Sequence, residues 1–129
     1  MEIVRGSRTD PKPSDRRTAT FTGVVYGEPL LATADGVAVT SVFFAPGART
    51  YWHSHEHGQV LRVLDGHGLV CAQGGEPQRL DAGDLVWALP GEAHWHGGAP
   101  DSMLLHLAIS LGTTNWLGPV ADDEYGGTR

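Results

Sequence analysis

The stretch GARTYWHSHEHGQVLRVLDG, residues 47–66, carries three of the seven histidines of this chain. His53 and His55 stand two positions apart, so an extended strand would project both side chains from one face. Gln59 follows a turn at Gly58 and adds a neutral oxygen donor beside the two imidazoles. Imidazole nitrogen is a common ligand of divalent transition metals. The stretch therefore predicts a strand, a turn and a second strand that together hold a metal ion.

A second pair of alternating histidines lies in GEAHWHGG, directly after the turn at 90–91. A small barrel can aim side chains from several strands at one interior point, so His94 could complete the ligand set. The alternative is that the glutamine amide only hydrogen-bonds a neighbour while three histidines hold the metal. Either set leaves one or two positions for water or substrate, as in catalytic metal sites. The predicted metal ligands are His53, His55, Gln59 and His94.

Short runs rich in β-branched and aromatic residues fill the chain from Thr20 onward. Glycine- and proline-containing turns separate these runs, and many short strands at even spacing predict an all-β sandwich or barrel. A short final turn of helix is expected at Asp122–Glu124. The expected strands are 21–26, 36–44, 59–64, 68–73, 84–89 and 103–110, and the expected turns are 27–29, 35–36, 46–47, 65–66, 74–75 and 90–91.

The length of 129 residues fits one domain. Residues 1–18 are polar, basic and contain two prolines, which favours a flexible N-terminal arm, an edge segment, or an arm that crosses onto a partner subunit. A single domain is expected over residues 19–129. The net charge of −6 argues against nucleic acid or an anionic membrane as partner. Cys71 is the only cysteine, so no intramolecular disulfide is possible and a reducing cytoplasm is expected, with Cys71 in the core. No apolar run approaches the roughly 18 residues that span a membrane, which predicts a soluble protein.

These motifs resemble those of the cupin superfamily. Gly47, His53-Ser54-His55, Gln59 and Gly66 are similar to the first cupin motif, which normally has glutamate where this chain has Gln59. Gly83-Asp84 and the run 89–94 are similar to the second motif, although the proline and glycine are adjacent and the closing asparagine is absent. The segments GDLVWALPGEAHWHGGAP, SMLLHLAIS and NWLGPVADDEY resemble small bacterial cupins related to manganese-dependent hydroxynitrile lyases, from about residue 20 to residue 125.

The resemblance implies a jelly-roll barrel, the cupin double-stranded β-helix. It also implies one divalent transition metal per chain, with manganese as the first choice and iron, nickel or zinc as alternatives, and a homodimer or homotetramer. With Gln59 in place of glutamate the site keeps a formal charge of +2. A bound alcohol should then be more acidic, and an anion such as cyanide should be held more strongly.

His106 interrupts the apolar run 103–109. A buried histidine needs a hydrogen-bonding partner, and such a residue is more often structural than catalytic. The resemblance, however, implies that His106 faces the barrel interior, where it could act as a general base. His96 shares a face with His94, so it is expected either beside the metal or as a hydrogen-bonding partner behind it. His57 and His67 are expected outside the site, His57 exposed or behind the ligands and His67 in a turn.

Pocket walls are expected from the strand over 37–44 and from the face that carries Trp87 and Trp95. Alternation alone leaves open which face of these strands is inward, because both faces are mostly apolar. The resemblance favours Thr40 and Val42 inward. Ordinary core packing is expected for the two other tryptophans, 52 and 116. The predicted pocket residues are Thr40, Val42, Thr50 and Trp87.

Together these features predict a metal-dependent lyase that acts on a small molecule. A cyanohydrin would be cleaved reversibly to an aldehyde and cyanide, with His106, assisted by His96, taking the hydroxyl proton. Two alternatives stay open. One is a metal-dependent dioxygenase with the same ligands, and the other is a cupin that binds a small molecule without catalysis.

Overall fold

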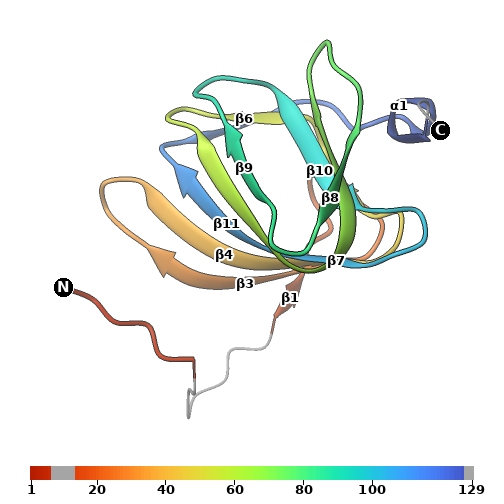
Figure 1. The fold of residues 1–129 in the computed structure, drawn as a ribbon. Coiled ribbons are helices and arrows are strands. Elements are labelled where there is room, and N and C mark those ends of the chain that lie inside the picture. The colour runs from red at the N-terminus through yellow and green to blue at the C-terminus, as the bar shows by residue number, and fades with distance from the viewer. Residues whose placement is uncertain (7–13, 127–129) are drawn as a thin grey trace.

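Antiparallel strands curl into a barrel in the computed structural model, which describes residues 1–6 and 14–126 (Figure 1). No helix in these described ranges is long and apolar enough to cross a membrane. The all-β jelly roll predicted from the sequence is confirmed. The elements are β1 (Asp15–Arg16), β2 (Phe21–Thr22), β3 (Val25–Ala32), β4 (Val37–Phe44), β5 (Arg49–Thr50), β6 (His53–His55), β7 (Gln59–Ala72), β8 (Gln78–Asp81), β9 (Leu85–Ala88), β10 (His94–Gly98), β11 (Leu104–Leu111), β12 (Thr114–Trp116) and α1 (Asp122–Gly126).

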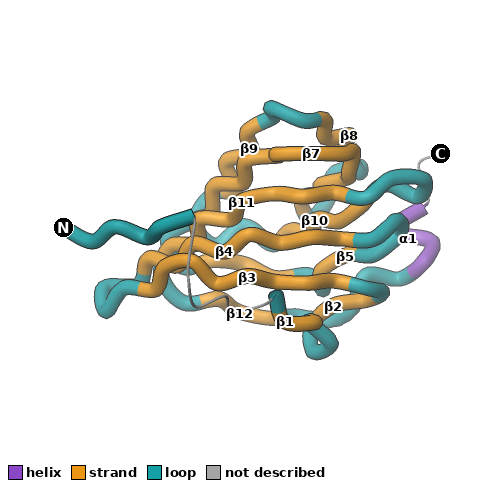
Figure 2. Tube along the Cα trace, turned by 90° about the horizontal axis from the view of Figure 1, so that it is seen from below, coloured by secondary structure: helices purple, strands orange, loops and turns teal. Residues whose placement is uncertain are grey.

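The long strand β7 joins the two halves of the barrel. Its first part pairs with β11 and β9, and its second part pairs with β10 and β8. Figure 2 shows β3, β4 and β11 side by side, in the order that the sheet continues to β7. The turn predicted at 65–66 is wrong, because β7 runs through these residues. The chain does not reverse here. Instead, the register between β7 and β11 shifts by one residue opposite Leu105 and His106, as in a β-bulge.

The strand β3 also runs through a predicted turn, at 27–29. Pro29 lacks a backbone N–H. Among the described residues, β1 pairs with β3 at Tyr26 and Gly27 and no strand pairs with Pro29 on this side, so proline is tolerated there. The register between β3 and β4 shifts just after this proline. The pairing of β1 with β3 makes the end of the predicted N-terminal arm an edge strand of the barrel. Residues 7–13 of that arm lie outside the described residues.

Two apolar clusters stabilise the barrel. The larger one fills one end of the interior and is formed by Val25, Val42, Phe44, Ala48, Val63, Leu80 and Leu104. The smaller one packs Cys71 and Trp95 against Val120 and Tyr125 at the C-terminal end of the chain. Trp95 is fully buried in this second cluster, so its prediction as a pocket wall is wrong. The expected helical turn over residues 122–124 is confirmed as part of α1.

Candidate active site

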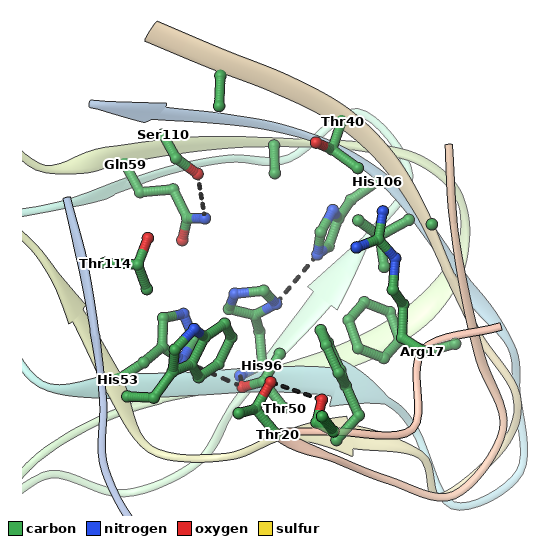
Figure 3. Close-up of a pocket in the computed structure, with 18 of the residues that line it drawn as sticks. Arg17, Thr20, Thr40, Thr50, His53, Gln59, His96, His106, Ser110 and Thr114 are labelled. Carbon is green, nitrogen blue, oxygen red and sulfur yellow. Dashed lines mark hydrogen bonds between the residues drawn. The ribbon is translucent and has the colours of Figure 1, made fainter. Parts of the chain in front are cut away.

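A cavity of about 640 Å³ lies inside the barrel between β4, β11 and β6. Figure 3 shows histidine, threonine and amide side chains that point into it from several strands. Three of the four predicted pocket residues, Thr40, Val42 and Thr50, lie in its wall. The wall also includes His53, His55, Gln59, His96 and His106.

The strand β6 presents its two histidines to the interior. His53 and His55 are both buried, while Ser54 between them is half-buried, as alternation in a strand requires. Gly58 makes the turn into β7 with a φ of 96°, and a Cβ at this position would collide with the ring of Trp87. Glycine at this turn therefore lets β7 begin with Gln59 beside the histidines.

Several imidazoles converge at one point. The ligand atoms of His53, His94 and His96 lie within 4.8 Å of one another. The ring of His55 adjoins this group, with its centroid 5.0 Å from that of His53 and 5.6 Å from that of His94. The structure thus brings the four predicted ligands together and adds His96 to the group.

Two backbone carbonyls fix the protonation of two of these rings. Nδ1 of His53 donates to the carbonyl of Tyr51 at 2.8 Å, and Nδ1 of His94 donates to the carbonyl of Glu92 at 3.0 Å. A carbonyl oxygen only accepts hydrogen bonds, so the ring proton must sit on Nδ1. The Nε2 atoms of His53 and His94 are left with lone pairs that can bind a metal.

The amide of Gln59 is oriented in the same way. Its Nε2 donates to the hydroxyl of Ser110 at 3.0 Å, and its Oε1 lies 3.0 Å from Nε2 of His94. With the His94 proton on Nδ1, these last two atoms are both acceptors and repel each other unless a cation lies between them. The buried Nε2 of His55 also has no hydrogen-bonding partner among the described residues. These donor atoms fit a bound divalent cation.

Burial keeps these imidazoles neutral. Removal from water, together with the nearby His94, lowers the pKa of His53 to about 3 and that of His55 to about 4. The pKa of His94 is also lowered by burial. A neutral imidazole is the form that binds a metal, so the site is prepared for metal at neutral pH.

A second buried histidine pair adjoins the cavity. Nε2 of His106 lies 3.0 Å from Nδ1 of His96, and the ring of Phe44 packs against both. The hydrogen bond between these two atoms holds one proton. The ring that donates this proton keeps a lone pair on its own outer nitrogen, which is Nδ1 if His106 donates and Nε2 if His96 donates. Both outer nitrogens are buried without a hydrogen-bonding partner in the described part of the chain. Burial lowers the pKa of His106 to about 4, and burial together with His106 lowers that of His96 well below its usual value.

Two tryptophans lie where the sequence did not place them. Trp87 is half-exposed on the outside of β9, because the next residue, Ala88, is the one that turns inward opposite Gln59. Its prediction as a pocket residue is therefore wrong. Trp116 was expected in the core, but it lines the cavity and its ring lies 4.7 Å from that of His53.

Some lining residues escaped the sequence analysis. Thr114 is 3.1 Å from Nδ1 of His55, and the β-branched pair 113–114 after a glycine was an available strand signal. Arg17 also lines the cavity, and the polar, proline-containing sequence before it has no pattern that predicts a cavity-lining residue. Of the two remaining histidines, His57 is exposed, as expected. His67 lies within β7, and its Nδ1 is 2.7 Å from Oδ1 of Asp81.

The sequence of this chain is similar to those of known proteins. The Cupin domain family matches residues 40–109. The chain is 44% identical over 133 residues to (R)-mandelonitrile lyase from Granulicella tundricola, covering 97% of this chain and 98% of that protein.

Solved structures give the same fold. A cupin-like protein from Thermotoga maritima superposes with a TM-score of 0.85 at 38% identity, covering 88% of this chain and 92% of that one. The polyketide cyclase RemF from Streptomyces resistomycificus gives a TM-score of 0.73 at 22% identity, covering 98% of this chain and 93% of that one. The second likeness supports the fold alone.

Proposed function

The chain belongs to the cupin family, and we propose that it is a metal-dependent lyase that cleaves cyanohydrins reversibly to an aldehyde and hydrogen cyanide. The observation that carries the proposal is the convergence of possible metal-binding atoms, Nε2 of His55 and the closely spaced Oε1 of Gln59 and Nε2 of His94, beside the buried His96–His106 pair. The likeness to a protein named (R)-mandelonitrile lyase over nearly the whole chain supports the choice of reaction.

The proposed metal ligands are Nε2 of His53, His55 and His94 and Oε1 of Gln59. We prefer His55 and Gln59 to His96 as ligands, because a proton donated by Nε2 of His106 to Nδ1 of His96 leaves the second proton of the pair on Nε2 of His96, which then has no lone pair for a metal. Manganese is the first choice of ion, with iron, nickel and zinc as alternatives. A divalent cation in this neutral donor set would supply positive charge that stabilises an alkoxide oxygen and a leaving cyanide.

The buried histidine pair handles the proton. With the shared proton on Nε2 of His106, Nδ1 of this residue keeps a lone pair and takes the proton of the cyanohydrin hydroxyl. The bond between the carbinol and nitrile carbons then breaks. Its electron pair leaves with cyanide, and the C–O bond becomes the aldehyde carbonyl. Nδ1 of His106 returns the proton to cyanide, which gives hydrogen cyanide.

The direct test is to incubate the metal-loaded protein with mandelonitrile and to measure benzaldehyde and cyanide release in equal amounts. Release well above the rate in buffer supports the proposal. No release with any of the four metals would overturn it.

A metal-dependent dioxygenase is the second candidate, because the group of His53, His94 and His96 would also support oxygen chemistry. Oxygen uptake with a catechol, a diketone or a flavonol would identify this reaction. A lyase consumes no oxygen under the same conditions.

We also propose that the chain assembles into a homodimer or homotetramer. The outer surface exposes Leu64, Leu85, Trp87 and Leu89, which a second copy could cover. The mass in solution at micromolar concentration tests this, and a strict monomer would contradict it.

A further inference from the structure

The wall of the cavity differs in charge from the rest of the chain. The chain carries a net charge of −6, with 15 acidic and 9 basic residues. In the described part of the chain, the residues that line the cavity include Arg16 and Arg17 but no aspartate or glutamate. Positive charge without a compensating carboxylate favours an anionic ligand.

Both arginines belong to the N-terminal strap, which we define as residues 16–21. The strap is fixed at both ends. The N–H of Arg17 donates to the carbonyl of Val25 at 2.8 Å, and the carbonyl of Thr20 accepts from the N–H of Tyr51 at 2.8 Å. Thr20 adopts a φ of 61°, which an L-residue with a branched side chain rarely takes. The strap is therefore a defined wall of the cavity.

The side chain of Arg17 has a seat on the neighbouring strand. It lies across Gly27 of β3, where a Cβ would collide with Nε and would lie 2.9 Å from both Cζ and Nη2. Because Gly27 has no side chain, the guanidinium can lie directly against the strand. No atom of the described residues accepts a hydrogen bond from this guanidinium, although its five N–H groups are fixed donors.

The position of Arg17 over Gly27 lies in the same row of paired residues as His106, the proposed general base. Gly27 pairs with Val42 of β4, and Val42 pairs with His106 of β11. The row crosses two strand spacings, so the backbones at Gly27 and His106 are roughly 10 Å apart. Figure 3 draws Arg17 on the same side of the cavity as His106 and Thr40.

From this arrangement we propose that the cavity binds a small substrate with a carboxylate remote from its reacting hydroxyl, and that Arg17 recognises this carboxylate. The planar guanidinium matches a carboxylate through two parallel hydrogen bonds. A benzene ring that carries the two groups para to each other is a rigid probe that keeps the carboxylate away from the reacting group. The identity of the reacting group rests on the proposed function, whereas carboxylate binding does not.

The test compares a matched pair of unreactive ligands, para-(hydroxymethyl)benzoate and its neutral amide, by calorimetry on the metal-loaded protein. The acid should bind more tightly than the amide by roughly tenfold to a hundredfold, which is the loss expected for a charge-assisted hydrogen bond. Arg17→Gln should remove this preference. Arg62→Gln is the control, because it removes the same charge from an exposed position on β7.

Two further variants test whether the preference for the acid depends on where the guanidinium lies or only on its positive charge. Gly27→Ala keeps the arginine but fills its seat, so it should reduce the preference for the acid. Arg17→Lys keeps the charge without the planar fork and should restore only part of it. Equal binding of acid and amide by the wild type, or a preference that survives in Arg17→Gln, would overturn the assignment.

Kinetics distinguishes this proposal from that of the reaction. With mandelonitrile and its para-carboxylate as substrates, Arg17→Gln should raise KM for the carboxylate at least roughly tenfold more than it raises KM for mandelonitrile. If neither compound is cleaved but the Arg17-dependent preference in calorimetry persists, the proposed reaction is wrong and the carboxylate site stands.

Discussion

The two ends of the barrel interior are built from the same strands but have opposite chemistry. On β4 and β11 the inward positions begin with Phe44 and Leu104, which are fully buried in the larger apolar cluster. Four residues away on each strand, toward the N-terminus of β4 and the C-terminus of β11, the inward residues are Thr40 and Ala108, both in the cavity wall. One continuous sheet thus supplies a closed apolar end for stability and an open polar end for chemistry.

His106 lies at the border between these ends. It follows Leu104 on the inward face of β11, and the ring of Phe44 lies 5.2 Å from its ring. The apolar end therefore removes water from the His96–His106 pair, and this desolvation is the main cause of the lowered pKa of both rings. The comparison suggests that substitutions at the two ends will have separable effects.

The largest effect is expected for His55→Ala at the polar end. Loss of one of four donors should abolish metal retention after gel filtration, while the fold remains, because β6 keeps its backbone pairing with β12. Elemental analysis and circular dichroism measure the two properties. His57→Ala is the matched control and should retain the metal, since this side chain is mostly exposed in the next turn. Equal metal loss in both variants would contradict the ligand assignment.

At the apolar end, Leu104→Ala should lower the free energy of unfolding by about 2–5 kcal/mol, the usual cost of a large cavity in a core. Chemical denaturation measures this change. Leu105→Ala, one position along on the outward and only half-buried face, should cost less. Metal content per folded molecule should stay unchanged in both. A parallel loss of metal in Leu104→Ala would show that the two ends are not separable.

His106→Ala should lower cyanohydrin turnover by roughly a hundredfold or more, because it removes the general base. Metal content and fold should be retained, since His106 is not a proposed ligand. Turnover, metal content and melting temperature must be measured on the same preparation. A purely structural histidine would instead lower the melting temperature and spare the rate per folded molecule, and that result would remove His106 from the mechanism.

A smaller effect is expected for Ser110→Ala. The hydroxyl of Ser110 accepts from Nε2 of Gln59 and so holds Oε1 toward His94. Without it the amide can rotate, and the affinity for the metal should fall roughly tenfold, as for other groups that orient a ligand. A metal titration against a competing chelator measures this. An unchanged affinity would mean that Gln59 is not a ligand or is oriented by other contacts.

The sequence predicted the elements whose pattern is local. Alternation alone placed His53 and His55 on one face, and the all-β class followed from short runs and turns. The long strand β7 was not predicted, because Asp65-Gly66 has the composition of a turn. An extra residue in β7, Leu64, lets the pairing with β11 continue across this point. Similarly, Pro29 predicted a break in β3, although no strand in the described part of the chain pairs with it on the β1 side, where proline is tolerated.

Features of the site that depend on pairing between strands far apart in the chain could not be predicted from the sequence. The inward face of β9 is decided by the pairing of Ala88 with Gln59, so Trp87 could not be placed by its own pattern. Arg17 lies over Gly27 because β1 pairs with β3, and this pairing has no signal in the local sequence. The contact between His96 and His106 joins strands that are not neighbours in the sheet.

The central claim, a metal-dependent lyase site at the polar end of the barrel, is tested most directly by one experiment on one preparation. Metal content and mandelonitrile cleavage are measured in the protein purified without added metal, after removal of metal by a chelator, and after reloading with manganese, iron, nickel or zinc in turn. We predict one divalent ion per chain, loss of cleavage on chelation, and recovery with at least one metal, manganese first. Undiminished cleavage by the metal-free protein, or a protein that retains none of the four metals, would contradict the account.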